Sequence, residues 1–379
     1  MLTLTPFYPS AADDGNGCFV SEPLEWVAQL GVRNTVIAVQ PIYRRKSGSG
    51  DSAVRGEWLR YFSLPGGMGL PIAGAFMFAR IMPRLRELHR AQRLDVIHAH
   101  GALPCGHAAM LVSKELNIPF VVSVHGLDAF STVQVGGRFG EWCRRISRLV
   151  YQAACRVICV SEHVRDAVLE GMAQNCRTSV VYNGVDPERF SPLPGSAPGE
   201  LKILSVGNLI PVKGHEALIR AMASLRPEFL QLELAIIGEG GERSRLETLA
   251  KDLNVADKVQ FLGRQSRAQV VDAMRNCTIF ALPSRYEGLG CVYLEAMSCG
   301  KPVIGCRGQG IAEIIQEGKS GFLIDPEDDQ GLESILRTLL REPAQYRHVG
   351  RIARDTILHG FTLEQQAKNL ARIYEECGL

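Results

Sequence analysis

The sequence predicts an α/β protein with two doubly wound domains, each built on a parallel sheet flanked by helices. Its 379 residues exceed the length that one hydrophobic core usually organises. Short runs rich in β-branched residues alternate with helical patterns along the chain, which is typical of parallel sheets. A segment with four prolines and two glycines, residues 187–200, interrupts this alternation and predicts a linker.

The first domain is expected to span residues 1–186. Its strands are predicted from apolar runs that are separated by helical patterns. These runs cover residues 2–5, 35–39, 95–98, 120–124, 156–160 and 178–182. Because neighbouring parallel strands need long crossover connections, helices are expected between them.

The second domain is expected to span residues 201–359, where the same alternation restarts. Its predicted strands cover residues 202–206, 232–237, 259–262, 278–282 and 302–305. A final helical pattern covers residues 363–377, and Thr362 is suited to cap its first turn.

Composition and charge exclude several classes of protein. Hydrophobic residues make up 46% of the chain and charged residues 22%, which excludes a disordered chain. The formal net charge of +2 gives no strong basic footprint for phosphate backbones, so no nucleic-acid partner is expected. The eleven cysteines are scattered and contain no CxxC pair, so neither a disulfide framework nor a zinc ribbon is expected.

The chain carries no obvious membrane or export signal. No apolar stretch approaches the roughly 18 residues that cross a bilayer. The first residues, MLTLTPFYPS, lack the basic and apolar regions of a signal peptide. We therefore expect the protein in the cytoplasm or on the cytoplasmic face of the membrane.

The strongest chemical signal is the run EGLGCVYLEAMSCG, which follows the predicted strand 278–282. Ligands of open α/β sheets bind at the carboxyl ends of strands. With a helix starting near Gly290, Glu287 lies in the preceding loop and Glu295 lies more than one turn into the helix. The N–H groups and the dipole of such a helix start favour phosphate, and Gly288 lets the backbone approach it. Taken alone, however, two such glutamates are more often ordinary surface acids.

A second candidate site follows the first strand of the second domain, in ILSVGNLIPVKGHEAL. Gly207 ends the strand, and Lys213 stands six residues later at the start of a helix. The ammonium group can neutralise phosphate oxygens as a point charge. A solvated lysine in a strand-to-helix turn is an equally good interpretation of this motif.

The first domain offers weaker signals. Gly15 and Gly17 follow its first strand and suit the close approach of a phosphate or a sugar. His125 closes the strand 120–124, where it either faces the ligand or is a hydrogen-bonded structural histidine. His98 and His100 suggest a metal site, but no carboxylate or cysteine trio accompanies them, so no metal is expected.

A basic amphipathic segment, which begins with Ile72 and ends with Arg93, suggests contact with an anionic membrane. Pro83 should kink or divide any helix there. A core-facing helix with a solvated basic side is the favoured alternative.

Taken together, these stretches resemble the large family of retaining glycosyltransferases with the GT-B fold, often called family 4 or glycosyl transferases group 1. The most specific element is the glutamate pair with seven residues between its members, Glu287 and Glu295. Supporting motifs occur in order over nearly the whole chain. They are NGVD at Asn183, GNLIPVKG at Gly207, FLGR at Phe261, PSRYEGLG at Pro283, GKPVIG at Gly300, GIAEII at Gly310 and GFLIDP at Gly321.

The resemblance implies two Rossmann-like domains that face a central cleft. Residues 1–186 would bind the acceptor, and residues 201–359 would bind the nucleotide-sugar donor. A C-terminal helix at about residues 360–379 would pack back onto the first domain.

The resemblance also assigns roles to individual residues. Glu295 would hydrogen-bond the ribose, the backbone at Gly263 and Arg264 would meet the base, and Lys213 would hold the diphosphate. Glu287 would contact the donor sugar, and His125 would lie by the anomeric carbon. The catalytic residues implied are Glu287, His125 and Lys213. The donor-binding residues implied are Gly15, Gly17, Gly207, Asn208, Lys213, Gly263, Arg264, Glu287, Gly288, Leu289, Gly290 and Glu295.

One position departs from the family pattern. Members commonly carry arginine where this sequence has Asn208, and that arginine shares the diphosphate charge with the lysine. Asparagine donates hydrogen bonds but brings no charge. Either Lys213 and the helix dipole suffice, or Arg264 or Arg285 approaches the diphosphate, or donor binding is weaker than usual.

The resemblance implies a metal-independent hexosyltransferase without a cofactor, whose co-substrate is a UDP- or GDP-linked sugar. The acceptor would be a glycan or a lipid-linked molecule, in cell-surface polysaccharide or glycolipid synthesis. A nucleotide-sugar epimerase, a phosphorylase of the same fold and a non-catalytic nucleotide-sugar binding protein remain open as alternatives.

Overall fold

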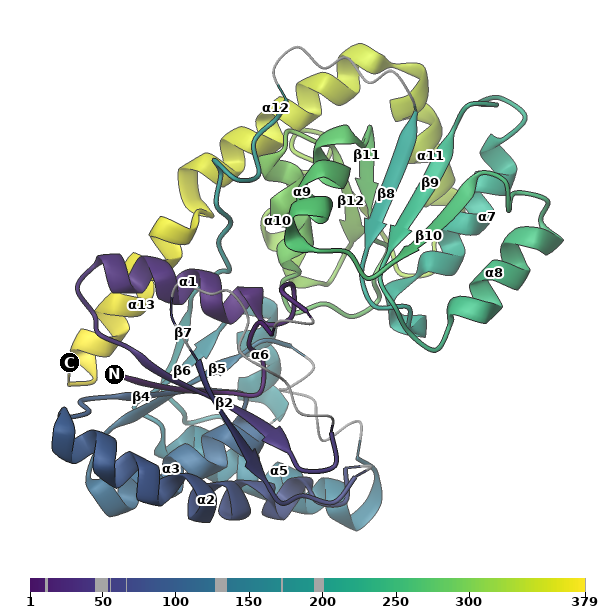
Figure 1. Cartoon of the computed structure of the whole chain (residues 1–379). Helices are drawn as coiled ribbons and strands as arrows, with labels where there is room; N and C mark the ends of the chain where they lie inside the picture. Colours follow the sequence, from purple (N-terminus) through teal and green to yellow (C-terminus); the bar gives the residue numbers. More distant parts are fainter. Residues whose placement is uncertain are drawn as a thin grey trace. The chain divides into compact units, whose positions relative to one another are not determined.

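The computed structural model describes residues 1–10, 13–44, 54, 56–65, 67–126, 135–171, 173–193 and 201–378. The chain divides into two compact units (Figure 1). The first unit combines Met1–Asn183 with Leu363–Leu379, and the second is Gly184–Thr362. Each unit is a parallel sheet with alternating helices, so the expectation of two Rossmann-like α/β domains is confirmed.

The sheet of the first unit has seven strands in the order β3-β2-β1-β4-β5-β6-β7, and the described pairs are parallel. The strand order reverses between β1 and β4, and such a switch point is where ligands of open sheets bind. The strands are β1 (Leu2–Thr5), β2 (Thr35–Pro41), β3 (Gly56–Tyr61), β4 (Ile97–His100), β5 (Phe120–Val124), β6 (Arg156–Cys159) and β7 (Thr178–Val180).

Helices cover both faces of this sheet. In Figure 1, α1 and α13 lie side by side on one face, and α2, α3 and α5 lie on the other. The helices are α1 (Cys18–Gln29), α2 (Leu70–Ala91), the π-helical segment η1 (Ala102–Gly106), α3 (His107–Leu116), α5 (Gly137–Ala153), α6 (Glu162–Gly171) and α13 (Leu363–Glu376).

Helix α2 runs through Pro83, so of the two expected effects of this proline, a kink or a division of the helix, the division does not occur. Proline removes one backbone hydrogen bond and costs about 3 kcal/mol in a helix interior. Here Met77, Ile81 and Leu85 are 0% exposed on the apolar face of the same helix. Their burial, at roughly 2 kcal/mol for each side chain, outweighs the cost of the proline.

The sheet of the second unit has six strands in the order β10-β9-β8-β11-β12-β13. Helices α7, α8 and α11 contribute to one buried apolar cluster with this sheet. The strands are β8 (Lys202–Val206), β9 (Glu233–Ile237), β10 (Val259–Gly263), β11 (Ile279–Ala281), β12 (Val303–Cys306) and β13 (Phe322–Ile324). The helices are η2 (Pro211–Lys213), α7 (His215–Leu225), α8 (Arg243–Asp252), α9 (Arg267–Asn276), α10 (Cys291–Ser298), η3 (Gly310–Glu313), α11 (Asp329–Arg341) and α12 (Pro343–Gly360).

The start of the expected linker packs against the second unit. Phe190 is 0% exposed, and its carbonyl accepts a hydrogen bond of 3.3 Å from Arg354. Arg275 donates to the carbonyl groups of Arg189 and Ser191 at 2.9 and 3.1 Å. Residues 187–193 are therefore held in place, and residues 194–200 lie outside the described residues.

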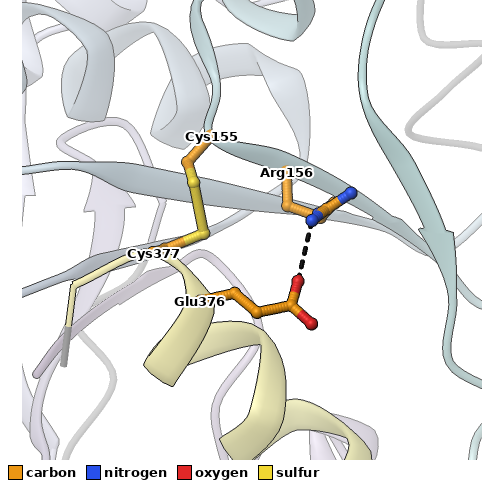
Figure 2. Close-up of a disulfide and its surroundings, with 4 residues drawn as sticks. All are labelled: Cys155, Arg156, Glu376 and Cys377. Carbon is orange, nitrogen blue, oxygen red and sulfur yellow. Dashed lines mark hydrogen bonds and ion pairs between the residues drawn. A yellow bond between two sulfur atoms is a disulfide. The ribbon is translucent and has the colours of Figure 1, made fainter.

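The C-terminal helix α13 belongs to the first unit, where it packs against α1. Figure 2 shows a disulfide between Cys155, just before β6, and Cys377, just after α13. Beside it, Arg156 and Glu376 form an ion pair of 2.7 Å. The scattered cysteines predicted no disulfide framework, and this single bond was not anticipated because its two partners lie 222 residues apart.

Candidate functional site

Lys213 and Glu287 form an ion pair at the carboxyl edge of the second sheet. Lys213 ends the short 3₁₀ turn η2, and α7 begins two residues later, so the lysine lies just before the helix. Its side chain is 13% exposed, and that of Glu287 is 17% exposed. The backbone N–H of Glu287 donates a hydrogen bond of 2.8 Å to Oε1 of Gln309, which fixes the loop.

Glycine at position 214 is required by the turn that carries Lys213. Gly214 has a φ of +71°, which side chains rarely adopt, and it is the N-cap of α7. A Cβ there would lie 2.2 Å from the carbonyl oxygen of Pro283. The turn is thus packed directly against the loop that leads to Glu287.

Glu295 lies in α10 and is 2% exposed. One carboxylate oxygen accepts a hydrogen bond of 2.6 Å from Arg267, whose guanidinium lies 5.0 Å from the ring centre of Phe190. The other oxygen, Oε2, is buried and has no hydrogen-bond partner among the residues that the structure describes. Because such a group is costly to leave unpaired, it is suited to accept a hydrogen bond from a ligand hydroxyl.

The loop from Gly288 to Gly290 joins these two carboxylates. Gly290 is the N-cap of α10, and a Cβ there would lie 3.2 Å from the carboxyl carbon of Glu287. Leu289 is 4% exposed. The hydroxyl of Tyr293 donates a hydrogen bond of 2.6 Å to the carbonyl of Leu282, just after β11, and so anchors α10 to the end of that strand. The start of α10 is therefore a fixed helix N-terminus with no acidic residue in its first turn.

The other predicted donor residues lie at neighbouring strand ends of the same unit. Gly207 and Asn208 follow β8, and Asn208 is exposed. Gly263 ends β10 with a φ of +68°, and Arg264 after it is exposed. Arg285 forms an ion pair with Glu327.

In the first unit, Gly17 has a structural requirement that Gly15 lacks. Gly17 has a φ of +77° at the start of α1, and a Cβ there would lie 2.4 Å from the carbonyl carbon of Phe7. For Gly15 the nearest atom of the described residues, on Asp13, would be 3.7 Å away. The ring of Phe7 lies 6.5 Å from that of His125, so Gly17 packs against the backbone of the residue whose side chain lies near His125.

His98, His100 and His125, which the sequence does not connect, lie together in the structure. His100 Nδ1 lies 2.8 Å from His125 Nε2, and the ring of His98 lies 4.3 Å from that of His100. His98 also bonds Ser123 at 2.7 Å and Tyr374 at 2.8 Å. Burial lowers the pKa of His98 to about 3, and the pKa of His100 falls well below its ordinary value for the same reason. Both rings are therefore neutral near pH 7.

No group of three or more His, Cys, Asp or Glu side chains in a metal-binding arrangement occurs in the described part of the chain. Among the described residues, no helix has both the length and the apolarity to span a bilayer. Arg84 and Arg86 in helix α2, and Arg93 just after it, pair with acidic residues. Arg80 and Arg90 are exposed and have no ion pair in the ranges that the structure covers.

Three residues that bond the candidate residues were not anticipated from the sequence. Arg267 pairs with Glu295, and Gln309 fixes the backbone of Glu287 in the second unit, while Tyr374 bonds His98 in the first unit. Only Arg267 carried a local signal. It is the first residue of α9, directly after Ser266, the N-cap residue that forms a capping box with Gln269.

Two family models match the chain on either side of the unit boundary. The model described as Glycosyltransferase Family 4 matches residues 22–189, and the one described as Glycosyl transferases group 1 matches residues 188–356. A protein described as D-inositol 3-phosphate glycosyltransferase from Corynebacterium jeikeium is 30% identical over 304 residues, covering 74% of this chain and 72% of that protein.

Solved structures with the same fold cover almost the whole chain. Sucrose-phosphate synthase from Thermosynechococcus elongatus superposes with a TM-score of 0.83 at 20% identity, covering 99% of this chain and 98% of the other. HepE from Anabaena, solved in complex with UDP, gives a TM-score of 0.74 at 22% identity, with 98% of each chain covered.

Proposed function

The chain belongs to the glycosyl transferases group 1 family of GT-B glycosyltransferases, and from this premise we propose that it is a retaining enzyme that uses a nucleotide diphosphate sugar as its donor. The acceptor is a glycan or a lipid-linked molecule, in polysaccharide or glycolipid synthesis. The arrangement of Lys213, Glu287 and Glu295 around the start of α10 carries the proposal.

Lys213 is the cation for the diphosphate in this proposal. An ammonium group has three N–H donors, and Glu287 uses one of them. Glu287 thereby orients the ammonium while two donors remain for phosphate oxygens. Because the pair is mostly buried, its field is weakly screened by solvent, which strengthens its effect on a bound anion.

Glu295 holds the ribose in this proposal. Its buried Oε2 is the acceptor for a ribose hydroxyl, while Arg267 fixes the carboxylate through Oε1. The backbone around Gly263 and Arg264 is assigned to the base. A likeness to HepE, which was solved with UDP, makes uracil the first base to test.

The donor sugar is assigned to Glu287, His125, Gly15 and Gly17 on the family resemblance. As the bond between the anomeric carbon and the diphosphate breaks, both bonding electrons leave with the diphosphate. The acceptor hydroxyl attacks from the side that the diphosphate leaves, and a donor phosphate oxygen takes its proton. Lys213 and the N-terminus of α10 stabilise the charge that grows on the leaving group, so this scheme needs no metal ion or cofactor.

We propose further that the enzyme acts in the cytoplasm and touches the cytoplasmic face of the membrane through α2. The exposed Arg80 and Arg90 supply positive charge, and the exposed Phe76 packs edge to face on Phe62 with ring centres 5.1 Å apart. Cosedimentation with phosphatidylglycerol vesicles at low salt tests this contact. Binding that is absent, or unchanged in Arg80→Glu/Arg90→Glu, contradicts it.

The proposed function is tested by ligand-dependent stability and by turnover. A donor nucleotide raises the melting temperature of the protein because it binds only the folded state. UDP, GDP and their glucose and mannose conjugates form the first panel, followed by release of free nucleotide with and without glycan acceptors. If no nucleotide raises the melting temperature, the proposal is wrong. If a nucleotide sugar is converted to its epimer without acceptor, the enzyme is an epimerase.

A further inference from the structure

His98, His100 and His125 lie together where two neighbouring strands end. His98 and His100 belong to β4, and His125 follows β5, which pairs with β4 in parallel. The planes of the His100 and His125 rings differ by 10°, and their centres lie 5.1 Å apart. Near-coplanar rings place Nδ1 of His100 2.8 Å from Nε2 of His125, a good hydrogen-bond distance.

Burial keeps the His100 ring neutral. The residue is 4% exposed, so it carries one N–H and one acceptor nitrogen. Its Nε2 is buried and has no hydrogen-bond partner within the described ranges. Nδ1 therefore makes the one described hydrogen bond of this ring, to Nε2 of His125, and this bond holds one proton that one ring donates to the other.

We propose that His100 is a positioning residue for His125, and that the hydrogen bond between the two rings fixes the ring plane of His125 and couples the tautomers of the two rings. The inference rests on the proposed function, in which His125 lies by the reacting carbon of the donor sugar.

Other side chains hold the His100–His125 pair in place, one next to His125 and others next to His100. The ring of Phe19 lies 4.7 Å from that of His125, so the imidazole is confined between an aromatic ring and its hydrogen bond to His100. On the far side, His98 stacks on His100 and is itself held by Ser123 and Tyr374. A ring that is held in this way does not have to be ordered during the reaction, which is the benefit of a preorganised site.

The test compares variants that keep or remove the hydrogen bond. His100→Phe keeps the ring volume and removes the bond, whereas His100→Asn places an amide nitrogen close to the position of Nδ1. With UDP-glucose as the probe, the release of UDP gives kcat and KM. We expect His100→Phe to lower kcat about ten- to a hundredfold with KM within about twofold, and His100→Asn to recover most of that loss.

A double-mutant cycle separates positioning from a general structural defect. In the His125→Ala background, His100→Phe should cause no further loss of kcat, because its effect passes through His125. Losses that multiply in the double variant would overturn the inference. His89→Phe is the matched control, since His89 of the same unit makes a single described bond, to the N–H of Leu94 at 3.1 Å, and its loss should leave kcat unchanged.

The outcomes distinguish the inference from the function on which it rests. If His125→Ala keeps the wild-type kcat, the proposed role of His125 is wrong. If His125→Ala is impaired but His100→Phe is not, only the positioning role of His100 is wrong. A readout without turnover is the ¹⁵N spectrum of histidine-labelled protein, in which one proton should be shared between Nδ1 of His100 and Nε2 of His125. If no coupling joins these two nitrogens, the inference is overturned even if UDP-glucose is not a substrate.

Discussion

Lys213 and Glu287 form an ion pair although 74 residues separate them in the sequence. Both side chains are mostly buried, so each charge has lost much of its hydration. Removing one partner from such a pair leaves an uncompensated charge and is more damaging than removing both. The pair therefore links the stability of the second unit to its capacity to bind a diphosphate.

Replacing Lys213 by alanine should lower kcat by about one to two orders of magnitude, because a cation that stabilises the leaving group is lost. Steady-state kinetics of the purified variant measure this effect. Lys368→Ala is the matched control, since Lys368 pairs with Glu364 on the surface with both side chains about half exposed. A Lys213→Ala enzyme with near-normal rates would exclude Lys213 from the active site.

Glu295→Gln should abolish the preference for ribose hydroxyls. Hydrogen bonds to a charged acceptor contribute about 1.5–3 kcal/mol, so the wild type should bind UDP at least about tenfold more tightly than 2′,3′-dideoxy-UDP. In Glu295→Gln the two ligands should bind with similar affinity. Calorimetric titration of both proteins with both ligands gives the comparison, and an unchanged ratio would contradict the role of Glu295.

Gly17→Ala should destabilise the first unit, whereas Gly15→Ala should not. At position 17 a Cβ meets the backbone of Phe7 and requires a left-handed conformation, which costs about 1–3 kcal/mol. At position 15 it meets no atom of the described residues closer than 3.7 Å. Urea denaturation of the two variants checks the difference, and equal midpoints would show that the start of α1 relaxes without cost.

The buried histidines should make the protein less stable in acid. Burial lowers the pKa of His98 to about 3 and that of His215 in the second unit to about 4, from ordinary values near 6.5. Below pH 6.5 the unfolded chain therefore takes up protons that the folded chain does not. The stabilisation is complete above about pH 6.5 and is lost as pH falls towards 3, by about 1 kcal/mol per pH unit for each such histidine.

Urea denaturation between pH 7.5 and pH 4.5 measures this dependence. His98→Phe should flatten the slope between pH 6.5 and pH 4.5, because the variant lacks the group that the unfolded chain protonates. If the free energy of unfolding of the variant depends on pH as steeply as that of the wild type, His98 is accessible to protons in the folded state.

The Cys155–Cys377 disulfide should stabilise the first unit, because it closes a loop across 222 residues of sequence. Constraining the unfolded chain over such a loop contributes about 5 kcal/mol in the chain-entropy model. Cys377→Ser should lower the free energy of unfolding by this amount without reductant. With dithiothreitol the wild type and the variant should have the same free energy of unfolding. If dithiothreitol does not change the free energy of unfolding of the wild type, the bond is not formed.

Much of the fold could be predicted from local patterns. The strands β1, β5 and β8 have the bounds expected from their apolar runs, and α10 begins one residue after Gly290. The strands β3 and β13 were missed. Only one residue of β3 is fully buried at the sheet edge, and β13 is three residues long, so neither has a clear apolar run.

The candidate site was predictable only where its residues are neighbours in sequence. The placing of Glu287 in a loop and of Glu295 in the following helix follows from helical spacing. The partner of Glu295, Arg267, stands 28 residues earlier on another helix. The bond between His100 and His125 depends on the register of β4 against β5, which no local pattern specifies.

The return of α13 to the first unit has a consequence for synthesis on the ribosome. The apolar cluster beneath α1 includes Leu370, Ile373 and Tyr374, which are translated after the whole of the second unit. The second unit is a single continuous segment, so all of its residues are made before α13. The first unit, although begun earlier, keeps an uncovered apolar face until α13 leaves the ribosome. The nascent chain is thus expected to need protection from aggregation in its N-terminal half.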